Sequence, residues 1–109
     1  MADTIKSPSQ SAPGAASEVD LYTVPASTTA VCSTLVIVNR GASAATYRVS
    51  VAIAGAATVN QQYIAFDEPI EATSRHTMTL GFTLNAADVV RVRASTADLS
   101  FNLFKVERT

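Results

Sequence analysis

The sequence predicts an all-β protein: an antiparallel β-sandwich of jelly-roll type, with about 7–8 strands and an extended N-terminal arm. From residue 21 onward, β-branched residues stand in short blocks, as is typical of strands. Turn residues separate these blocks at intervals of about 8–12 residues. No block keeps a hydrophobic period of 3.6 residues for three turns, so no helix is long enough to connect parallel strands. These observations exclude a parallel α/β fold.

Residues 1–18 are predicted to form an extended arm, and residues 19–109 the β-sandwich domain. The arm contains Pro8, Pro13 and Gly14 but almost no large apolar side chain. Such a segment cannot bury enough apolar surface to offset the entropy lost on ordering. We expect Ile5 and Val19 to be the side chains that anchor it.

The first three predicted strands carry different hydrophobic patterns. Residues 21–24 form a short strand that ends at Pro25, because proline cannot donate to a central ladder. Residues 29–39 form a second strand whose positions 35–38 are all apolar, as in a strand covered on both faces. A turn at residues 39–43 follows. The third strand alternates: residues 47, 49, 51 and 53 face the core, and residues 46, 48, 50 and 52 face outward.

The second half of the chain predicts four further strands. Residues 62–66 form one strand, which is followed by a turn at residues 67–69. The strand at residues 75–80 places His76, Met78 and Leu80 on one face. Residues 83–88 form a corner in which Asn and Asp bond to nearby backbone. The last strands, residues 89–94 and 99–106, are predicted to form a tight hairpin through residues 95–98.

Composition narrows the possible partners. The chain has 109 residues, a net charge of −1 and 16% charged residues, and Ala, Thr and Ser number 19, 13 and 11. Such a charge gives no electrostatic basis for binding nucleic acid or an anionic membrane. No apolar run approaches the about 18 residues that a membrane span needs, and the N-terminus does not resemble a signal peptide. We expect a soluble protein made in the cytoplasm, with no membrane and no nucleic-acid partner.

No pattern in the sequence indicates catalysis, a metal or a cofactor. One cysteine and one histidine cannot form an internal disulfide or the usual zinc cages. His76 lies in an alternating strand, and Asp67 and Glu68 are neighbours in a predicted turn, where side chains diverge. Cys32 is expected to be a small buried hydrophobic residue. We therefore predict that the chain is not an enzyme and needs no cofactor.

The basic and aromatic residues leave two interpretations open. Arg91 and Arg93 project from one face of a strand, and Lys105 and Arg108 are expected near them across the predicted hairpin. Without interleaved aromatic residues, this stripe indicates a solvated or subunit-facing edge rather than a nucleic-acid site. A carbohydrate-binding module is the alternative. It would require exposed aromatic rings, for which the candidates are Tyr47, Tyr63 and Phe82.

Four segments carry a resemblance to a known class of proteins. They are residues 21–31 (LYTVPASTTAV), 36–41 (VIVNRG), 84–92 (LNAADVVRV) and 94–102 (ASTADLSFN). They resemble small β-sandwich virion proteins of tailed bacteriophages, over residues 21–106. Such proteins are capsid decoration (cement) proteins or components of the tail, baseplate and fibre-attachment region. The resemblance implies a structural role in the virion, symmetric oligomers with a homotrimer favoured, and no catalytic residues.

The hypothesis from the sequence is a phage decoration protein that binds the capsid surface through subunit and arm contacts. Its partner would be the major capsid protein. Short Thr, Ser and Ala side chains lose little rotamer entropy in flat contacts, and a proline-containing arm is partly pre-extended. The alternative is a tail, baseplate or fibre-associated module, either structural or host-glycan-binding. The predicted assembly contacts are Ile5, Lys6, Pro8, Pro13, Val19, Arg91 and Arg93.

Overall fold

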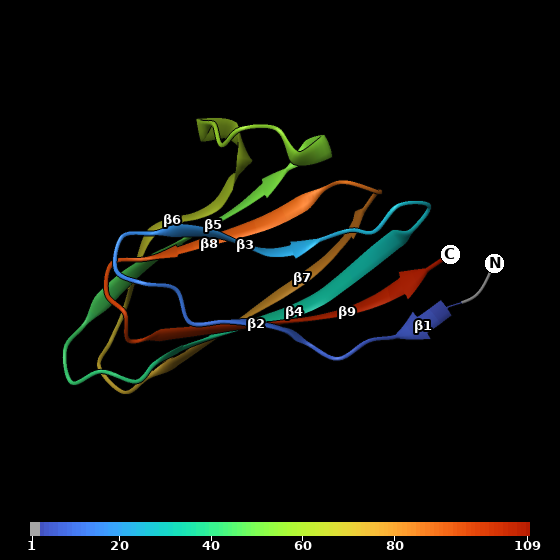
Figure 1. Cartoon of the computed structure of the whole chain (residues 1–109). Coiled ribbons are helices and arrows are strands. Elements are labelled where there is room, and N and C mark those ends of the chain that lie inside the picture. Colours follow the sequence, from blue (N-terminus) through green and yellow to red (C-terminus); the bar gives the residue numbers. More distant parts are fainter. Residues whose placement is uncertain (1–2) are drawn as a thin grey trace.

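The computed structural model, which describes residues 3–109, is a sandwich of two antiparallel sheets packed face to face (Figure 1). Two short 3-10 helices lie between the fifth and sixth strands, at η1 (Ile53–Gly55) and η2 (Asn60–Gln62). The strands are β1 (Asp3–Ile5), β2 (Ser9–Ser11), β3 (Glu18–Thr23), β4 (Thr29–Asn39), β5 (Ala45–Ala52), β6 (Tyr63–Ile70), β7 (Arg75–Leu84), β8 (Val89–Ala94) and β9 (Leu99–Arg108).

The strand order identifies the jelly-roll topology. Sheet A has the order β1-β9-β4-β7, with β2 also paired to β9, and sheet B has the order β3-β8-β5-β6. Because β1 and β2 follow one another along the same edge of β9, they act as one interrupted strand. Each sheet then has four strands, and the chain passes between the sheets in the double Greek-key pattern of jelly rolls. The predicted fold class is confirmed, and the sheets close as a sandwich.

The core lies between the two sheets and follows the alternation of the strands. Phe101 and Leu103 of β9 and Leu35 of β4 are fully buried from sheet A. Val49 of β5 and Val92 of β8 meet them from sheet B. Side chains of alternating positions reach one face of a sheet, so these strands supply a continuous apolar layer.

The central strand β4 was predicted to be covered on both faces, and its burial can be compared with that prediction. Leu35 and Ile37 face the core and are fully buried, whereas Val36 and Val38 are half-buried on the outer face. The expectation that β4 is covered on both faces is thus met on one face. Figure 1 shows no third layer outside sheet A in the described part of the chain.

The predicted C-terminal hairpin is wrong. β8 pairs with β3 and β5 in sheet B, whereas β9 pairs with β4 in sheet A. The connection at residues 95–98 crosses between the sheets and is held by backbone bonds from Ser95 to Thr46 and from Arg40 to Asp98, each of 2.9 Å. Lys105 and Arg108 therefore do not lie beside Arg91 and Arg93.

The predicted turn at residues 67–69 is also wrong, because β6 continues to Ile70. Asp67 takes a left-handed φ of 50°, and the register between β5 and β6 shifts twice. A β-bulge of this kind bends a strand without ending it. The corner after β7 is confirmed, since the Asp88 carboxylate accepts bonds of 2.8 Å from the backbone N–H of both Asn85 and Ala54.

The bond to Ala54 ties the corner to the segment between β5 and β6. This segment, residues 53–62, carries η1 and η2 and is called the flap below. Ile53, expected on the core face of the third strand, lies in the flap and is exposed.

The predicted arm contains two of the strands. β1 and β2 hydrogen-bond along β9 of the same chain, and Asp3 stands opposite Arg108. Pro13 is buried in the connection that leads from β2 to β3. Part of the arm therefore runs along its own sandwich, and contact between the arm and another subunit stays a prediction.

Candidate assembly surfaces

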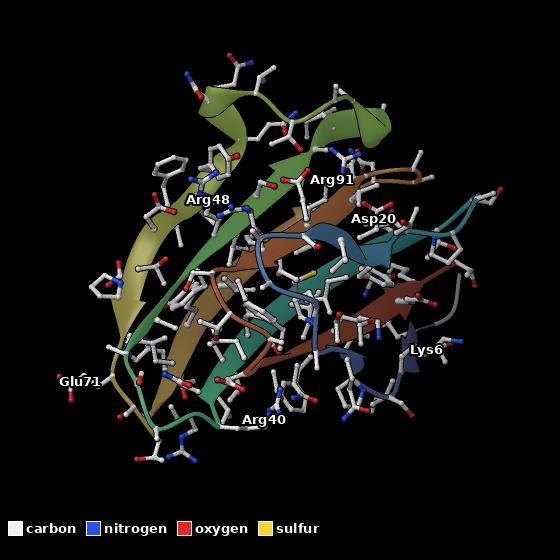
Figure 2. All side chains as sticks on the ribbon, turned by 60° about the vertical axis from the view of Figure 1, so that its left-hand side comes forward. Lys6, Asp20, Arg40, Arg48, Glu71 and Arg91 are labelled. Atoms are coloured by element: carbon white, nitrogen blue, oxygen red, sulfur yellow. The ribbon has the colours of Figure 1, made fainter. Side chains whose placement is uncertain are left out.

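The two outer faces of the sandwich differ in chemistry. Sheet A presents Val, Ile, Phe and Thr side chains, whereas sheet B presents Arg, Asp and Glu together with exposed Ile64 and Phe66. In Figure 2, the labelled Arg48 and Arg91 point outward from sheet B. The outer faces therefore suit different partners.

The outer face of sheet A is called the valine–threonine face and is ordered by strand register. Directly opposed residues in antiparallel strands place their side chains on the same face. Three of its rows contain no charged side chain; they lie between the row of Asp3, Arg108 and Thr29 at one end and a row with Arg75 at the other. The rows, read across the strands, are Ile5, Val106, Val31 and Thr83; then Phe104, Thr34 and Thr79; then Asn102, Val36 and Thr77; and last Ser100, Val38 and Arg75.

Large apolar side chains on this face are open to solvent. Ile5 is 87% exposed, Val31 46% and Phe104 41%. A hollow of about 200 Å³ lies in the same region and is lined by Val31, Val106 and the Asp3–Arg108 pair, with two threonines. A contiguous apolar patch that is fixed on a rigid sheet is typical of a protein–protein contact surface.

Charged side chains on the outer face of sheet B are engaged in contacts within the chain. The Arg91 guanidinium donates to Asp20 at 3.0 Å and to the carbonyl oxygens of Gly55 and Ala56 in the flap. Arg91 thus anchors the flap over sheet B. Arg93 lies in register between Glu18 and Arg48.

The arm is fixed to β9 by polar contacts at the end of the core. Lys105 is 8% exposed, and its ammonium donates to the carbonyl of Ser7 at 2.6 Å. Glu107 accepts a 2.6 Å bond from the Tyr22 hydroxyl and pairs with Lys6 at 3.7 Å. Burial lowers the pKa of Lys105 and is the main cause that raises the pKa of Tyr22. The arm therefore supplies partners for buried polar groups, which would otherwise be costly.

Salt bridges at two exposed sites lower the pKa of the carboxylates that take part in them. Arg108 holds Asp3 through two hydrogen bonds, and these bonds lower the pKa of Asp3. In the same way Arg48 binds both oxygens of Asp67, at 2.7 and 3.2 Å, and lowers its pKa. The first pair fastens β1 to β9, and the second fastens β6 to β5.

The predicted contact residues fall in four places. Ile5 lies on the valine–threonine face, as the row through Val106 shows. Lys6 and Pro8 lie along β9, whereas Pro13 is buried and Val19 packs against the core. Arg91 and Arg93 face outward from sheet B, away from Ile5, Lys6 and Pro8 along sheet A. Val19 pairs with Val92 between the two arginines, but its side chain packs on the opposite, core face.

Sequence reasoning missed most of the valine–threonine face. Neither Phe104 nor Val31 was assigned to a contact surface from the sequence. The signal was present in β9, where the positions opposite in parity to Leu99, Phe101 and Leu103 include Phe104 and Val106. Apolar residues on both parities of one strand indicate two apolar faces.

The groups considered for catalysis are held in structural contacts. The Tyr47 hydroxyl and Nδ1 of His76 are 2.9 Å apart between the sheets, and burial raises the pKa of Tyr47. Cys32 is buried, which raises the pKa of its thiol to about 11. Within residues 3–109, no three His, Cys, Asp or Glu side chains are grouped to hold a metal ion.

The aromatic candidates for carbohydrate contact differ in exposure. Tyr47 is buried, and Phe82 is half-buried against the core. Tyr63 is half-buried, and its ring makes an edge-to-face contact with Phe66 at 4.8 Å between centroids. These two rings and Asn60 line a hollow of about 340 Å³ outside sheet B.

The described residues contain no helix that is long and apolar enough to cross a membrane.

Comparisons with known proteins found similarity in structure but none in sequence. No protein-family model and no curated protein matches the chain. A chain of infectious bursal disease virus, strain Gx, matches with a TM-score of 0.57 and 10% identity over 97% of this chain and 32% of that chain. A chain of the T13 particle of the same virus matches with a TM-score of 0.57 and 12% identity, over 97% and 29%. A pentameric capsid protein from metagenomic phage sequences matches with a TM-score of 0.43 and 15% identity, over 98% and 61%.

This chain thus spans about a third of the length of the two virus chains. At 10–12% identity, the likeness establishes that the chain shares its fold with a domain-sized part of chains from a virus particle.

Proposed function

We propose that the chain is a structural virion protein that decorates the capsid of a tailed bacteriophage. The observation that carries the proposal is the valine–threonine face, a rigid surface whose middle rows carry no charge and on which Ile5, Val31 and Phe104 are exposed. The fold shared with chains of a virus particle supports it. The chain acts by contact with other polypeptides and performs no chemistry.

The size of the face matches this role. Four strands about 4.8 Å apart and about ten residues long, with a rise of about 3.3 Å per residue, give a projected area of about 600 Å². One side of a standard protein–protein interface buries about 800 Å². With the relief of its side chains, a single sheet face is therefore large enough for a specific contact.

Short side chains make this contact favourable. Threonine and valine each have a single side-chain rotamer angle, χ1, and branching restricts it, so little entropy is lost when a partner covers them. By contrast, a surface of Lys and Glu would lose up to about 2 kcal/mol per ordered side chain. The face is therefore better suited to flat docking than the charged outer face of sheet B.

The arm is the second proposed contact. Ile5 lies on the face and Lys6 is exposed next to it, so a subunit that covers β9 also covers the arm. Many weak contacts gain from multivalency when copies are arrayed on a particle. We propose a homotrimer as the assembling unit, with the major capsid protein as the partner.

The experiment that tests the proposal is the location of the chain in purified particles. Mass spectrometry of virions purified on a density gradient is expected to detect its peptides at a fixed ratio to the major capsid protein. Cryo-electron microscopy is expected to show the sandwich on the capsid with the valine–threonine face covered. Absence of the chain from particles would refute the role, and density at the tail or baseplate would replace capsid decoration by the tail-associated alternative.

A mass measurement in solution tests the oligomer separately. Light scattering of the full chain after size-exclusion chromatography is expected to give three times 11.4 kDa. A monomeric mass at all concentrations would exclude the trimer but leave docking on particles to be judged by imaging.

A further inference from the structure

The hollow lined by Asn60, Tyr63 and Phe66 lies on the charged side of the sandwich, away from the valine–threonine face. Phe66 is 55% exposed although its ring is fixed in place. The Arg48 guanidinium carbon lies 4.1 Å from the ring centroid, and Tyr63 packs edge-to-face on it. An exposed ring held on two sides is a rigid platform.

The backbone of β6 is distorted where it carries this platform. Adjacent residues of a regular strand point to opposite faces, yet Phe66 and Asp67 both reach the same Arg48 guanidinium. The two register shifts and the left-handed φ of 50° at Asp67 make this possible. Aspartate tolerates the left-handed region, so β6 continues through this point while Phe66 and Asp67 both reach Arg48.

The groups around the platform combine an apolar surface with a neutral polar rim. Asn60 is exposed on the flap, with an amide that both donates and accepts. The Asp67 carboxylate does not line the hollow; Arg48 donates one bond to each of its oxygens. Because Asp67 compensates the charge of Arg48, the hollow does not favour an anion such as a phosphate.

This chemistry matches a sugar ring. A pyranose presents C–H bonds on one face, which suit an aromatic ring, and hydroxyl groups at its edge, which suit amide groups. The hollow, at about 340 Å³, is in the lower range of small-ligand sites. We propose that Phe66, Tyr63 and Asn60 form a binding site for neutral saccharides, with Arg48 and Asp67 holding the platform. The site is independent of the proposed assembly role.

The test begins with the full chain on a panel of immobilised neutral mono- and oligosaccharides of glucose, galactose, mannose and N-acetylhexosamines. The sugar that is retained best is then titrated by NMR. Phe66→Ala is expected to weaken its binding at least about tenfold, and Asn60→Ala severalfold. Phe66→Tyr, which keeps the ring face, is expected to retain binding. The matched control is Phe104→Ala, which removes an exposed ring from the other sheet and is expected to leave sugar binding unchanged.

Thermal melting of each variant establishes that it is folded; if Phe66→Ala unfolds, Asn60→Ala and Phe66→Leu carry the test. Absence of binding to any saccharide of the panel at millimolar concentration overturns the proposal. So does binding that survives the loss of the Phe66 ring. Adenosine, titrated in parallel, must bind more weakly than the sugar, since preferential adenosine binding would make the hollow a stacking site for bases. Particle binding by Phe66→Ala separates this outcome from failure of the assembly role.

Discussion

Introducing charge into the valine–threonine face is expected to abolish assembly while leaving the sandwich folded. The perturbation is the double variant Val31→Glu with Phe104→Glu. Both side chains are on the outer face, at 46% and 41% exposure. The variant therefore removes apolar surface that a partner would cover and places two carboxylates where that partner must dock.

The magnitude follows from the exposed fractions. An aromatic side chain buries about 200 Å², so the exposed part of Phe104 offers about 80 Å², or about 2 kcal/mol at about 25 cal/mol per Å². About half of a full valine burial remains available at Val31, which is about 1 kcal/mol. Together they amount to about 3 kcal/mol per subunit, or about a hundredfold in affinity. Desolvation of the new carboxylates adds to this loss.

The assay combines co-sedimentation of the chain with purified particles and urea unfolding of the free chain. Glutamate is disfavoured in strands, so each substitution is expected to lower the unfolding free energy by at most about 1 kcal/mol. Ile64→Glu is the matched control, because Ile64 is 44% exposed but belongs to sheet B. Particle binding by the double variant at wild-type affinity, or an equal loss in the control, would refute the assignment of this face.

Three further measurements test the core, the buried thiol and the arm. Phe101→Ala, at a fully buried position, is expected to lower the unfolding free energy by about 3–5 kcal/mol in urea titrations, against less than about 1 kcal/mol for Thr77→Ala; equal losses would contradict the register. Because burial raises the pKa of Cys32 to about 11, its labelling by a thiol reagent at pH 8 is expected only at the rate of unfolding, and rapid labelling of native protein would contradict its placement. The bonds from Arg108 hold the pKa of Asp3 below its ordinary 3.8, so their stabilisation is present above pH 3.8 and is lost as the pH falls through the lower, folded-state pKa. The urea midpoint is thus expected to drop in acid, and to drop less for Asp3→Asn.

The strands with clear alternation could be predicted because burial alone determines their pattern. Residues 46–49 and 75–80 alternate in burial as the period of two requires, whereas Ser50, predicted to face outward, is only 1% exposed. The connection at residues 95–98 could not be predicted in this way. A four-residue polar link is compatible both with a hairpin and with a crossing between sheets, and backbone bonds to Thr46 and Arg40, which are distant in sequence, determine which one forms.

The candidate surfaces were harder to foresee than the fold. β1 and β2 have three residues each, which is too short for a hydrophobic period, and they form because β9 offers an edge. Asp67 was interpreted as part of a turn because aspartate favours turns and the left-handed region. The same preference permits a bulge in a continuing strand. Because the bulge was not foreseen, the exposure of Phe66 beside it was not predicted.

The position of β9 affects how the chain can fold during its synthesis. Among the strands of residues 3–109 it is the last to be synthesised, yet it lies in the interior of sheet A and pairs with residues as early as Asp3. Until β9 emerges, one edge of β4 has no paired strand, and β1 and β2 have no strand with which to pair. Pairing between strands that are distant in sequence is slow, and unpaired strand edges favour aggregation of nascent chains. We therefore expect the sandwich to complete its folding only after residue 108 has been translated.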